Sequence, residues 1–387
     1  MAARHDVLIA QQTPTRRGGQ GQRVCTLVDA LTRAGRDVKL IYVRFGADEP
    51  DPALVANPKV ELRELVASRG PRRALTYARH RLAGVPDGWA RSISPELVAA
   101  ATAAAETPGT ARVIADGPAV MSALVGLARR RPVIYNAHNL ESSFRVGLPD
   151  QRLGSPRRLR AAERRIMEAA AESWMVSAAD ARGARELAPG ARIRVVPNVI
   201  NTDDITPVAP GGGGTDALMV GDFTYAPNRE ALAFLLDEVL PRLERRGAQV
   251  TLRLVGRGLE DDPAARRPGV LVRGRVDDLA AEYRAARCAL VPLLSGGGTP
   301  FKLLEALAYA VPVVSTPRAA DALGLDDGEH LRVAGDADRF AAAVAEIVSG
   351  ADADADARAA RGRAVVEERY SVAALARMLA DDDRVAA

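Results

Sequence analysis

The sequence has no apolar run of the roughly 18 residues that a membrane-spanning helix requires, and its first residues lack the apolar core of a secretion signal. It has only two cysteines among 387 residues, which excludes a disulfide framework. Cys25 and Cys288 each lie inside an apolar run, so both are expected to be buried thiols in a reducing compartment. Aromatic residues are scarce at 4% while Ala, Arg and Val are abundant, a bias typical of a GC-rich genome rather than of a function. These absences predict a cytoplasmic protein.

A large excess of one charge is also missing. The net charge is only +4, and Asp and Glu are interspersed with Arg along the chain, which argues against a nucleic-acid partner. The small basic excess fits a solvated Arg-rich surface, or a surface that attracts anionic donors or membrane phosphates. Apolar residues make up 48% and charged residues 26%, as in soluble globular proteins, and the length suffices for two α/β domains.

Short runs rich in Val, Ile and Leu alternate with stretches of helical period, and this alternation occurs twice. The first series of expected strands is Val7–Ala10, Val38–Val43, Val113–Ala115, Val133–Tyr135, Trp174–Val176 and Ile193–Val196. The second series is Leu218–Val220, Val250–Val255, Val270–Val272, Ala289–Leu293, Val313–Ser315 and Leu331–Val333. A segment rich in Pro and Gly, up to Gly214, separates the two series. Consecutive apolar positions suit strands covered on both faces, so the sequence predicts an α/β fold of two Rossmann-like, doubly wound parallel-sheet domains facing each other across a cleft.

Three segments lie outside this pattern. Residues Arg69–Arg91 and Arg152–Arg165 are Arg-rich and partly helical in period, so each fits either a contact with a membrane surface or a solvated helix face. Asp352, Asp354 and Asp356 have the spacing of a carboxylate metal site. Because no turn glycine and no closing Glu accompany them, we interpret this run as exposed helix and expect no metal site.

The segment from Ser295 to Glu305 carries the strongest chemical signal. Three glycines and Thr299 follow an expected strand, and Pro300 suits the first turn of a helix. Glycines allow close approach of the backbone to a ligand, and the start of a helix attracts anions. Lys302 would oppose the helix dipole there, which a phosphate partner explains, and Glu305 lies one turn further on the same face, within reach of a ribose. The alternative is a glycine turn before an ordinary helix.

These residues resemble the donor site of GT-B glycosyltransferases of family 4, whose pattern is similar to the stretch from Gly296 to Thr316. Other segments resemble the family in the same order along nearly the whole chain: Pro14–Arg23, Tyr135–Glu141, Val195–Asn198, Met219–Asn228, Leu254–Gly258 and Val272–Asp278. The resemblance implies a C-terminal nucleotide-sugar-binding domain at residues 216–365, an N-terminal acceptor-side domain at 1–203 and a linker at 204–215. It also implies that residues 366–387 form a helix that packs back on the N-terminal domain.

The resemblance further implies roles for individual residues. Glu305 would bind the donor ribose, while Lys302 and the amides around Gly298 and Thr299 would hold the diphosphate. The base would meet the backbone at Arg275 and Val276. The remaining implied donor-side and sugar-side residues are Gly18, Gly19, His138, Asn139, Glu141, Asn228, Arg229, Gly256 and Gly297.

His138 is implied to lie against the transferred sugar. It is one of only four histidines and ends an expected strand, where open α/β sheets place their ligand sites. A strand-end histidine satisfied by local hydrogen bonds is the alternative. For Glu141, helix capping around Asn139 is as good an explanation as a substrate contact.

Two positions depart from the common family pattern. Many relatives have a Glu where this chain has Gly297, and many have an Arg and Lys pair where this chain reads Asp222 to Asn228, followed by Arg229. A glycine-rich, lysine-bearing subgroup, with the pattern GGGTxxKxxE, shares both changes. They shift phosphate neutralisation onto Lys302, the helix dipole and Arg229, and they leave sugar selectivity open.

The resulting functional hypothesis is a retaining, metal-independent glycosyltransferase with no tightly bound cofactor. Its donor would be a nucleoside-diphosphate sugar of UDP or GDP type. The acceptor would be a small molecule, a glycan or a lipid-linked intermediate of the cell envelope, reached in the cytoplasm or at the inner face of the membrane. Alternatives on the same fold are a nucleotide-sugar epimerase, a phosphorylase and a non-catalytic nucleotide-sugar-binding partner protein.

Overall fold

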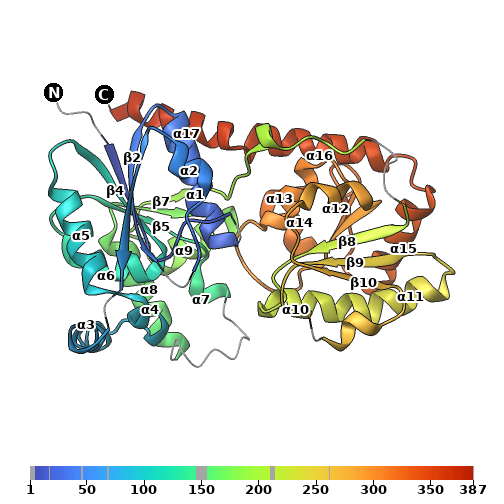
Figure 1. Cartoon of the computed structure of the whole chain (residues 1–387), viewed down its shortest axis with the longest axis horizontal. Helices are drawn as coiled ribbons and strands as arrows, with labels where there is room; N and C mark the ends of the chain where they lie inside the picture. The colour runs from blue at the N-terminus through green and yellow to red at the C-terminus, as the bar shows by residue number, and fades with distance from the viewer. Residues whose placement is uncertain are drawn as a thin grey trace. The chain divides into compact units, whose positions relative to one another are not determined.

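The computed structural model describes residues 5–16, 18–44, 47–67, 69–144, 155–209, 214–260 and 262–386. Contacts within the chain divide it into two units (Figure 1). Unit 1 comprises Met1–Asn198 together with Leu375–Ala387, and unit 2 comprises Val199–Ala374. Each unit contains one parallel sheet of its own.

Unit 1 is built on seven parallel strands in the order β3-β2-β1-β4-β5-β6-β7. The strands are β1 (His5–Ala10), β2 (Asp37–Arg44), β3 (Val60–Val66), β4 (Thr110–Asp116), β5 (Val133–Asn136), β6 (Glu172–Met175) and β7 (Ile193–Val195). The helices are α1 (Gly19–Arg33), α2 (Pro52–Ala56), α3 (Pro71–Leu82), α4 (Asp87–Ser92), α5 (Pro95–Glu106), α6 (Gly117–Ala128), α7 (Glu141–Phe144), α8 (Pro156–Ala169) and α9 (Ala178–Leu187).

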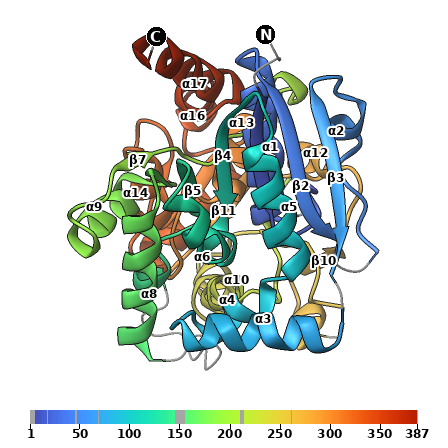
Figure 2. The same cartoon turned by 90° about the vertical axis from the view of Figure 1, so that its left-hand side faces the viewer.

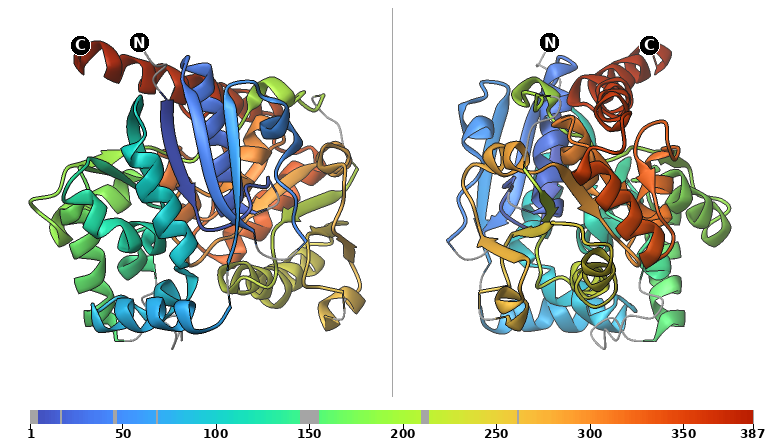
Figure 3. Two further views of the ribbon diagram at one scale, coloured as in Figure 1. Left: turned by 60° about the vertical axis from the view of Figure 1, so that its left-hand side comes forward. Right: turned by 90° about the vertical axis from the view of Figure 1, so that its right-hand side faces the viewer.

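Helices cover both faces of this sheet, as Figures 2 and 3 show. Val7 and Ile9 pack with α5 and α6 in one core cluster, while Leu8 between them is equally buried and must point to the opposite face because side chains alternate along a strand. Successive strands are added toward one edge from β1 to β3 and toward the other edge from β4 to β7, so the strand order reverses between β1 and β4. The carboxyl ends of β1 and β4 therefore lie at the switch point where open α/β sheets bind ligands.

Unit 2 has six parallel strands in the order β10-β9-β8-β11-β12-β13. The strands are β8 (Asp216–Val220), β9 (Thr251–Val255), β10 (Val270–Gly274), β11 (Cys288–Val291), β12 (Val313–Ser315) and β13 (Arg332–Val333). The α-helices are α10 (Ala226–Ala233), α11 (Leu240–Arg245), α12 (Leu279–Ala285), α13 (Phe301–Ala308), α14 (Pro317–Leu323), α15 (Ala337–Ser349), α16 (Ala355–Arg369) and α17 (Val372–Ala386), which continues into unit 1. Short helical segments are η2 (Thr202–Asp204), η3 (Phe234–Val239), which is a π-helix between α10 and α11, and η4 (Pro263–Arg266).

The predicted pair of doubly wound parallel sheets is confirmed. One strand of unit 1 was missed. β3 reads Val-Glu-Leu-Arg-Glu-Leu-Val, with apolar and polar residues alternating, and it lies at the edge of the sheet beside β2. Runs of consecutive apolar residues are typical of strands covered on both faces, so a search for such runs passes over an edge strand with this alternating pattern.

Two expectations outside the sheets need correction or completion. Asp352 precedes α16 instead of lying on an exposed helix, and its nearly buried carboxylate pairs with Arg332 and Arg358. The Arg-rich stretch from Arg69 forms α3 and α4, and α3 has no buried residue. The other Arg-rich stretch opens α8, although residues 152–154 lie outside the described residues.

Candidate functional site

In unit 2, the loop between β11 and α13 has the backbone of a close-approach turn. Gly296 and Gly298 have φ angles of 107° and 74°, in the left-handed region that favours glycine. Two hydrogen bonds hold the loop: Arg318 donates to the Gly296 carbonyl at 2.6 Å, and Thr316 Oγ1 donates to the Leu293 carbonyl at 2.5 Å. A positive φ at two of three glycines explains why the sequence has glycine here.

The amino end of α13 adjoins this loop. The sequence had suggested that Pro300 lies in the first turn of the helix, whereas it is the N-cap residue just before that turn. Its carbonyl accepts the backbone N–H groups of Leu303 and Leu304. No described side chain caps the helix. The Oγ of Ser295 is buried and has no hydrogen-bond partner among the described residues. A buried hydroxyl without a partner, in the loop that leads to an uncapped helix start, is an arrangement that a polar ligand could satisfy.

Lys302 extends its ammonium group toward the loop after β8. Its Nζ donates to Asn228 Oδ1 at 2.5 Å, and Asn228 Nδ2 in turn donates to the Asp222 carbonyl at 2.8 Å. Among the described residues, no carboxylate lies within salt-bridge distance of this Nζ. Burial lowers the pKa of Lys302 to about 8, although the charge of Glu305 acts in the opposite direction. The ammonium is therefore a half-buried cation held by one amide, and an anion would stabilise it.

Glu305 lies one turn further along α13, near two stacked tyrosines. The rings of Tyr283 and Tyr309 are 4.5 Å apart and nearly parallel. Burial is the main cause that raises the pKa of both phenols, and the charge of Glu305 raises them further. Sequence reasoning missed this tyrosine pair; the spacing of four between Glu305 and Tyr309 on one helix was the available signal.

A glycine follows each of the strands β8 and β9: Gly221 and Gly256. Gly256 has a φ of 138°, and a Cβ on it would lie 1.7 Å from the carbonyl oxygen of Gly221. A Cβ on Gly221 would itself lie 3.3 Å from Lys302 Nζ. Packing alone therefore requires glycine at position 256, and this packing brings the β8 loop against the lysine.

Two of the arginines implied in donor binding, Arg229 and Arg275, have exposed side chains. Arg229 pairs with Asp262 at 2.9 Å and is half exposed, so its charge is already compensated by a carboxylate. Arg275 is exposed, and Val276 after it packs against the apolar core. The backbone at these two positions follows β10, at the same carboxyl edge of the sheet as the glycine loop.

In unit 1, polar side chains meet at the carboxyl ends of β4 and β5. His138 Nε2 lies 2.9 Å from Asp116 Oδ1, and Asn136 Nδ2 donates to the same oxygen at 2.7 Å. Arg23, on α1, donates to Asn136 Oδ1 at 2.6 Å. The His138 ring packs over Gly117, where a Cβ would lie 3.5 Å from its Cε1. His138 thus has a local hydrogen-bond partner, and that partner belongs to a buried network that sequence reasoning missed.

The segment after His138 is held by two acids from other helices. Asp180 Oδ1 accepts the N–H of Leu140 at 3.2 Å. The Glu163 carboxylate accepts the N–H groups of Glu141 and Ser142 at 2.6 Å and 3.0 Å. Glu163 is buried, and burial raises its pKa to about 7. One explanation for Glu141 was helix capping. In the structure, the helix start at Glu141 and Ser142 is capped by the carboxylate of Glu163, which accepts their backbone N–H groups.

The glycines before α1 differ in what surrounds them. Gly18 is the N-cap residue of α1 in extended conformation, and no atom lies within 4 Å of the place of a Cβ. Gly19, like Gly18, is exposed. A Cβ on Gly21, by contrast, would lie 2.3 Å from the Thr15 carbonyl oxygen. Packing therefore explains Gly21, whereas nothing in the packing of the described residues requires glycine at position 18.

Both halves of the chain match models of one enzyme group. The model of Glycosyltransferase Family 4 matches residues 17–204, and the model of Glycosyl transferases group 1 matches residues 214–350. The chain belongs to the family 4, group 1 glycosyltransferases.

Individual relatives agree with this assignment. The chain is 32% identical over 165 residues to a phosphatidyl-myo-inositol mannosyltransferase of Mycobacterium leprae, a match that covers 40% of this chain and 43% of that protein. Among solved structures, sucrose-phosphate synthase of Thermosynechococcus elongatus is similar with a TM-score of 0.73 and 20% identity, covering 99% of both chains. HepE of Anabaena, in complex with UDP and glucose, has a TM-score of 0.70 and 15% identity, covering 97% of this chain and 98% of that one. The two structures show that the fold is the GT-B fold.

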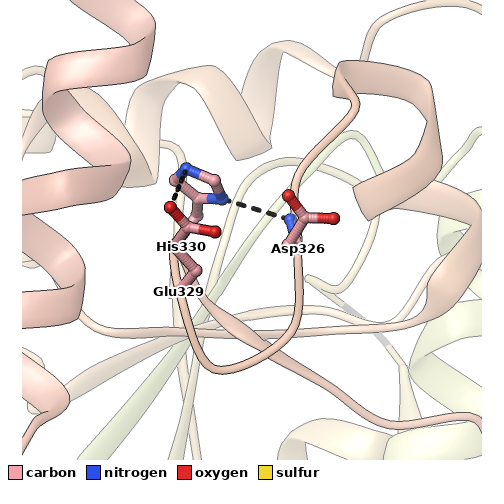
Figure 4. A group of neighbouring side chains, drawn as sticks. All are labelled: Asp326, Glu329 and His330. Atoms are coloured by element: carbon pink, nitrogen blue, oxygen red, sulfur yellow. Dashed lines mark hydrogen bonds and ion pairs between the residues drawn. The ribbon is translucent and has the colours of Figure 1, made fainter.

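One group of side chains in this glycosyltransferase has the proximity of a metal site. Ligand atoms of Asp326, Glu329 and His330 lie within 4.8 Å of one another (Figure 4). His330 Nδ1 accepts the N–H of Asp326 at 3.1 Å, and its Nε2 lies 3.9 Å from Glu329. Both ring nitrogens therefore already face local groups that hold the turn before β13.

No helix in the described part of the glycosyltransferase is both long and apolar enough to cross a membrane.

Proposed function

We propose that this chain transfers a sugar from a nucleoside-diphosphate sugar to an acceptor hydroxyl or amine, with retention of configuration and without a metal ion. The observation that carries the proposal is Lys302. It is a half-buried cation, held by an amide and by no described carboxylate, one residue into a helix that follows a glycine loop. A diphosphate would supply the missing negative charge to both the ammonium and the helix start.

The same groups would accelerate the reaction. Breaking the bond between the sugar and the diphosphate places negative charge on the leaving group. The hydrogen-bond donors are held in place before the reaction: Lys302, the amides of Gly298 and Thr299, and the hydroxyl of Ser295. They therefore stabilise the transition state, in which this charge develops, more than they stabilise the ground state. This chemistry needs no metal, because the lysine and the helix start supply the positive charge.

The donor is of UDP or GDP type. Glu305 binds the ribose through its hydroxyls, and the backbone at Arg275 and Val276 receives the base. The complexes of HepE with UDP and glucose and with UDP-glucose, on the same fold, support a UDP-sugar. Gly297, in a stretch of the pattern GGGTxxKxxE, supports membership of the glycine-rich subgroup. His138, Asn139 and Glu141 are the proposed residues on the sugar or acceptor side, and Gly18 and Gly19 are proposed to face the donor phosphate or the acceptor.

The acceptor is a cell-envelope glycan, a lipid-linked intermediate or a natural-product scaffold. A peripheral contact with the membrane is supported by α3, where two exposed leucines, Leu75 and Leu82, alternate along one face with the exposed Arg72 and Arg79. An apolar and basic helix face of this kind suits the surface of a bilayer that contains anionic lipids.

The proposal is tested by nucleotide binding followed by product analysis. Calorimetric titration with UDP, GDP, ADP and dTDP should show binding of at least one, weakened in Lys302→Ala and unchanged in Lys39→Ala, which removes a partly buried lysine of β2 paired with Glu61. Release of nucleotide from the matching sugar donor, with a new glycoside when an acceptor is present, identifies a transferase. Epimerised donor without acceptor identifies an epimerase, and binding without turnover identifies a partner protein. Absence of binding for all four nucleotides contradicts the proposal.

A further inference from the structure

Arg23 has an unusual position for an arginine. It is 4% exposed, and its guanidinium donates to Asn136 Oδ1 at 2.6 Å, to Asn198 Oδ1 at 3.0 Å and to the Val196 carbonyl at 3.1 Å. None of these three acceptors carries a charge. Burial lowers the pKa of Arg23 to about 10, with Asp116 and Asp180 acting in the opposite direction, so the side chain stays charged at neutral pH. A buried cation without a direct carboxylate partner destabilises a fold, so stability alone does not explain Arg23.

The hydrogen bonds of Arg23 fix the amide of Asn136. A guanidinium can only donate, so the oxygen of the Asn136 amide must point toward Arg23. The Nδ2 of Asn136 must then point the other way, where it meets Asp116 Oδ1 at 2.7 Å. An amide that could otherwise rotate by half a turn is thus held in one orientation by a charge.

The orientation continues through Asp116 to His138. The carboxylate of Asp116 is 1% exposed, and in ionised form it can only accept. Its Oδ1 receives Asn136 Nδ2 and lies 2.9 Å from His138 Nε2. The histidine must therefore carry its proton on Nε2, and its basic nitrogen is Nδ1.

We propose that Arg23, Asn136 and Asp116 form a relay of positioning residues that fixes both the tautomer and the ring orientation of His138. In this relay each member leaves the next only one choice of donor or acceptor. Any group that approaches Nδ1 of His138 must then donate a hydrogen bond, as a sugar hydroxyl does, whereas a carboxylate would be disfavoured. This selectivity rests on the proposed function, since it concerns the sugar that His138 contacts.

Two further observations support a functional rather than a structural role. Asp116 Oδ2 is buried without a hydrogen-bond partner among the described residues, so the carboxylate is not fully satisfied by the fold. Gly117, directly after it, has a φ of 83°, and a Cβ there would lie within 4 Å of all three of the ring atoms Cε1, Nδ1 and Nε2 of His138. The strand end is thus shaped to receive the ring in contact with the backbone.

The tautomer can be read directly by ¹⁵N–¹H correlation spectroscopy of the four histidines, with His138 assigned by its loss in His138→Gln. The wild type, at a pH where the ring is neutral, should show a protonated Nε2 and an unprotonated Nδ1. In Asp116→Asn the neutral amide can donate as well as accept, so the Nδ1-protonated form should appear. Arg23→Lys, which keeps the charge but cannot make three hydrogen bonds in a fork, should show the same change to a smaller extent.

The kinetic consequence is about a tenfold loss of kcat in Asp116→Asn, the size of one lost hydrogen bond, with nucleotide affinity unchanged because that site lies in unit 2. Asp6→Asn is the matched control. Asp6 is also a buried carboxylate of the same sheet, paired with Arg36 and Arg112, but it lies at the amino end of β1. This variant should lose stability yet keep both the tautomer and kcat.

The relay is overturned if wild-type His138 carries its proton on Nδ1, or if Asp116→Asn leaves the Nε2-protonated form unchanged. These spectra need no substrate. If no nucleotide sugar is turned over, the proposed function fails while the spectra still decide whether the relay exists.

Discussion

Each unit places its candidate groups at the carboxyl edge of its own parallel sheet, but one unit builds them from backbone and the other from side chains. Unit 2 uses backbone: the glycines of residues 296–298, the uncapped start of α13 and one lysine. Unit 1 uses side chains: the buried Arg23, Asn136 and Asp116, and the partly buried His138. A backbone site suits a phosphate group, which is the same in every donor, whereas oriented side chains suit the sugar, which differs between donors.

The sharpest test of this contrast compares two glycines. Gly256→Ala places a Cβ 1.7 Å from the Gly221 carbonyl oxygen at a φ of 138°, so it should destabilise unit 2 by about 4 kcal/mol. Gly18→Ala in unit 1 meets no atom within 4 Å at a φ of 173°, and should change stability by less than about 0.5 kcal/mol. Denaturant unfolding of both variants measures the difference, and equal stability of the two would show that the close packing of β8 and β9 is wrong.

The buried acid of unit 1 should make its stability depend on pH. Because the pKa of Glu163 is raised from 4.5 to about 7 in the folded state, its contribution is fully present below pH 4.5 and is lost as pH rises through 7. The loss is about 3 kcal/mol from this shift. Urea unfolding between pH 5 and 8 should follow this trend in the wild type.

The control for this dependence is Glu163→Gln, which cannot ionise. Its single amide oxygen can accept from only one of the two N–H groups of Glu141 and Ser142, so its stability should be lower at pH 5 but nearly independent of pH. A variant as dependent on pH as the wild type would assign the effect to another group.

Removing the lysine of unit 2 should affect rate more than folding. Lys302→Ala should lower kcat by on the order of a hundredfold, the cost of removing one strong electrostatic donor. Since the pKa of Lys302 is about 8, the wild type should also lose nucleotide affinity as pH rises through 8, and binding near that pH should take up protons. Calorimetry in buffers of different ionisation enthalpy measures this uptake, and wild-type turnover in Lys302→Ala would exclude its role.

The candidate site of unit 2 could be predicted from the sequence, whereas the network of unit 1 could not. The donor loop of unit 2 is contiguous, so glycines, Pro300, Lys302 and Glu305 could be interpreted from one short stretch. The network of unit 1 joins Arg23 to residues 113 and 175 positions away, and no local pattern indicates such pairs. Both sheets could be predicted from short runs of apolar residues, and among the strands of the described residues only the alternating edge strand β3 was missed.

Residues that form no part of either network were misjudged for the same reason. Asp352 looked exposed because its neighbours in the sequence are Ala and Asp, yet Arg332, from β13, pairs with it. Arg229 looked available for a phosphate, yet Asp262 compensates it from 33 positions away. The sequence shows which charges exist, whereas pairing depends on what the fold brings together.

The smallest effect is expected at the surface of unit 1. Leu75 and Leu82 of α3 are 71% and 90% exposed and lie seven residues apart on one face of the helix, beside Arg72 and Arg79 with the same spacing. Partial burial of two leucines, with about 1 kcal/mol from each arginine, would give weak binding to vesicles containing phosphatidylglycerol. Changing both leucines to Ser should reduce cosedimentation about tenfold without altering nucleotide affinity, whereas the same change at Val55, exposed on α2, should not. Equal binding to neutral phosphatidylcholine vesicles would exclude the arginines, and no binding to either would leave α3 as a solvated helix.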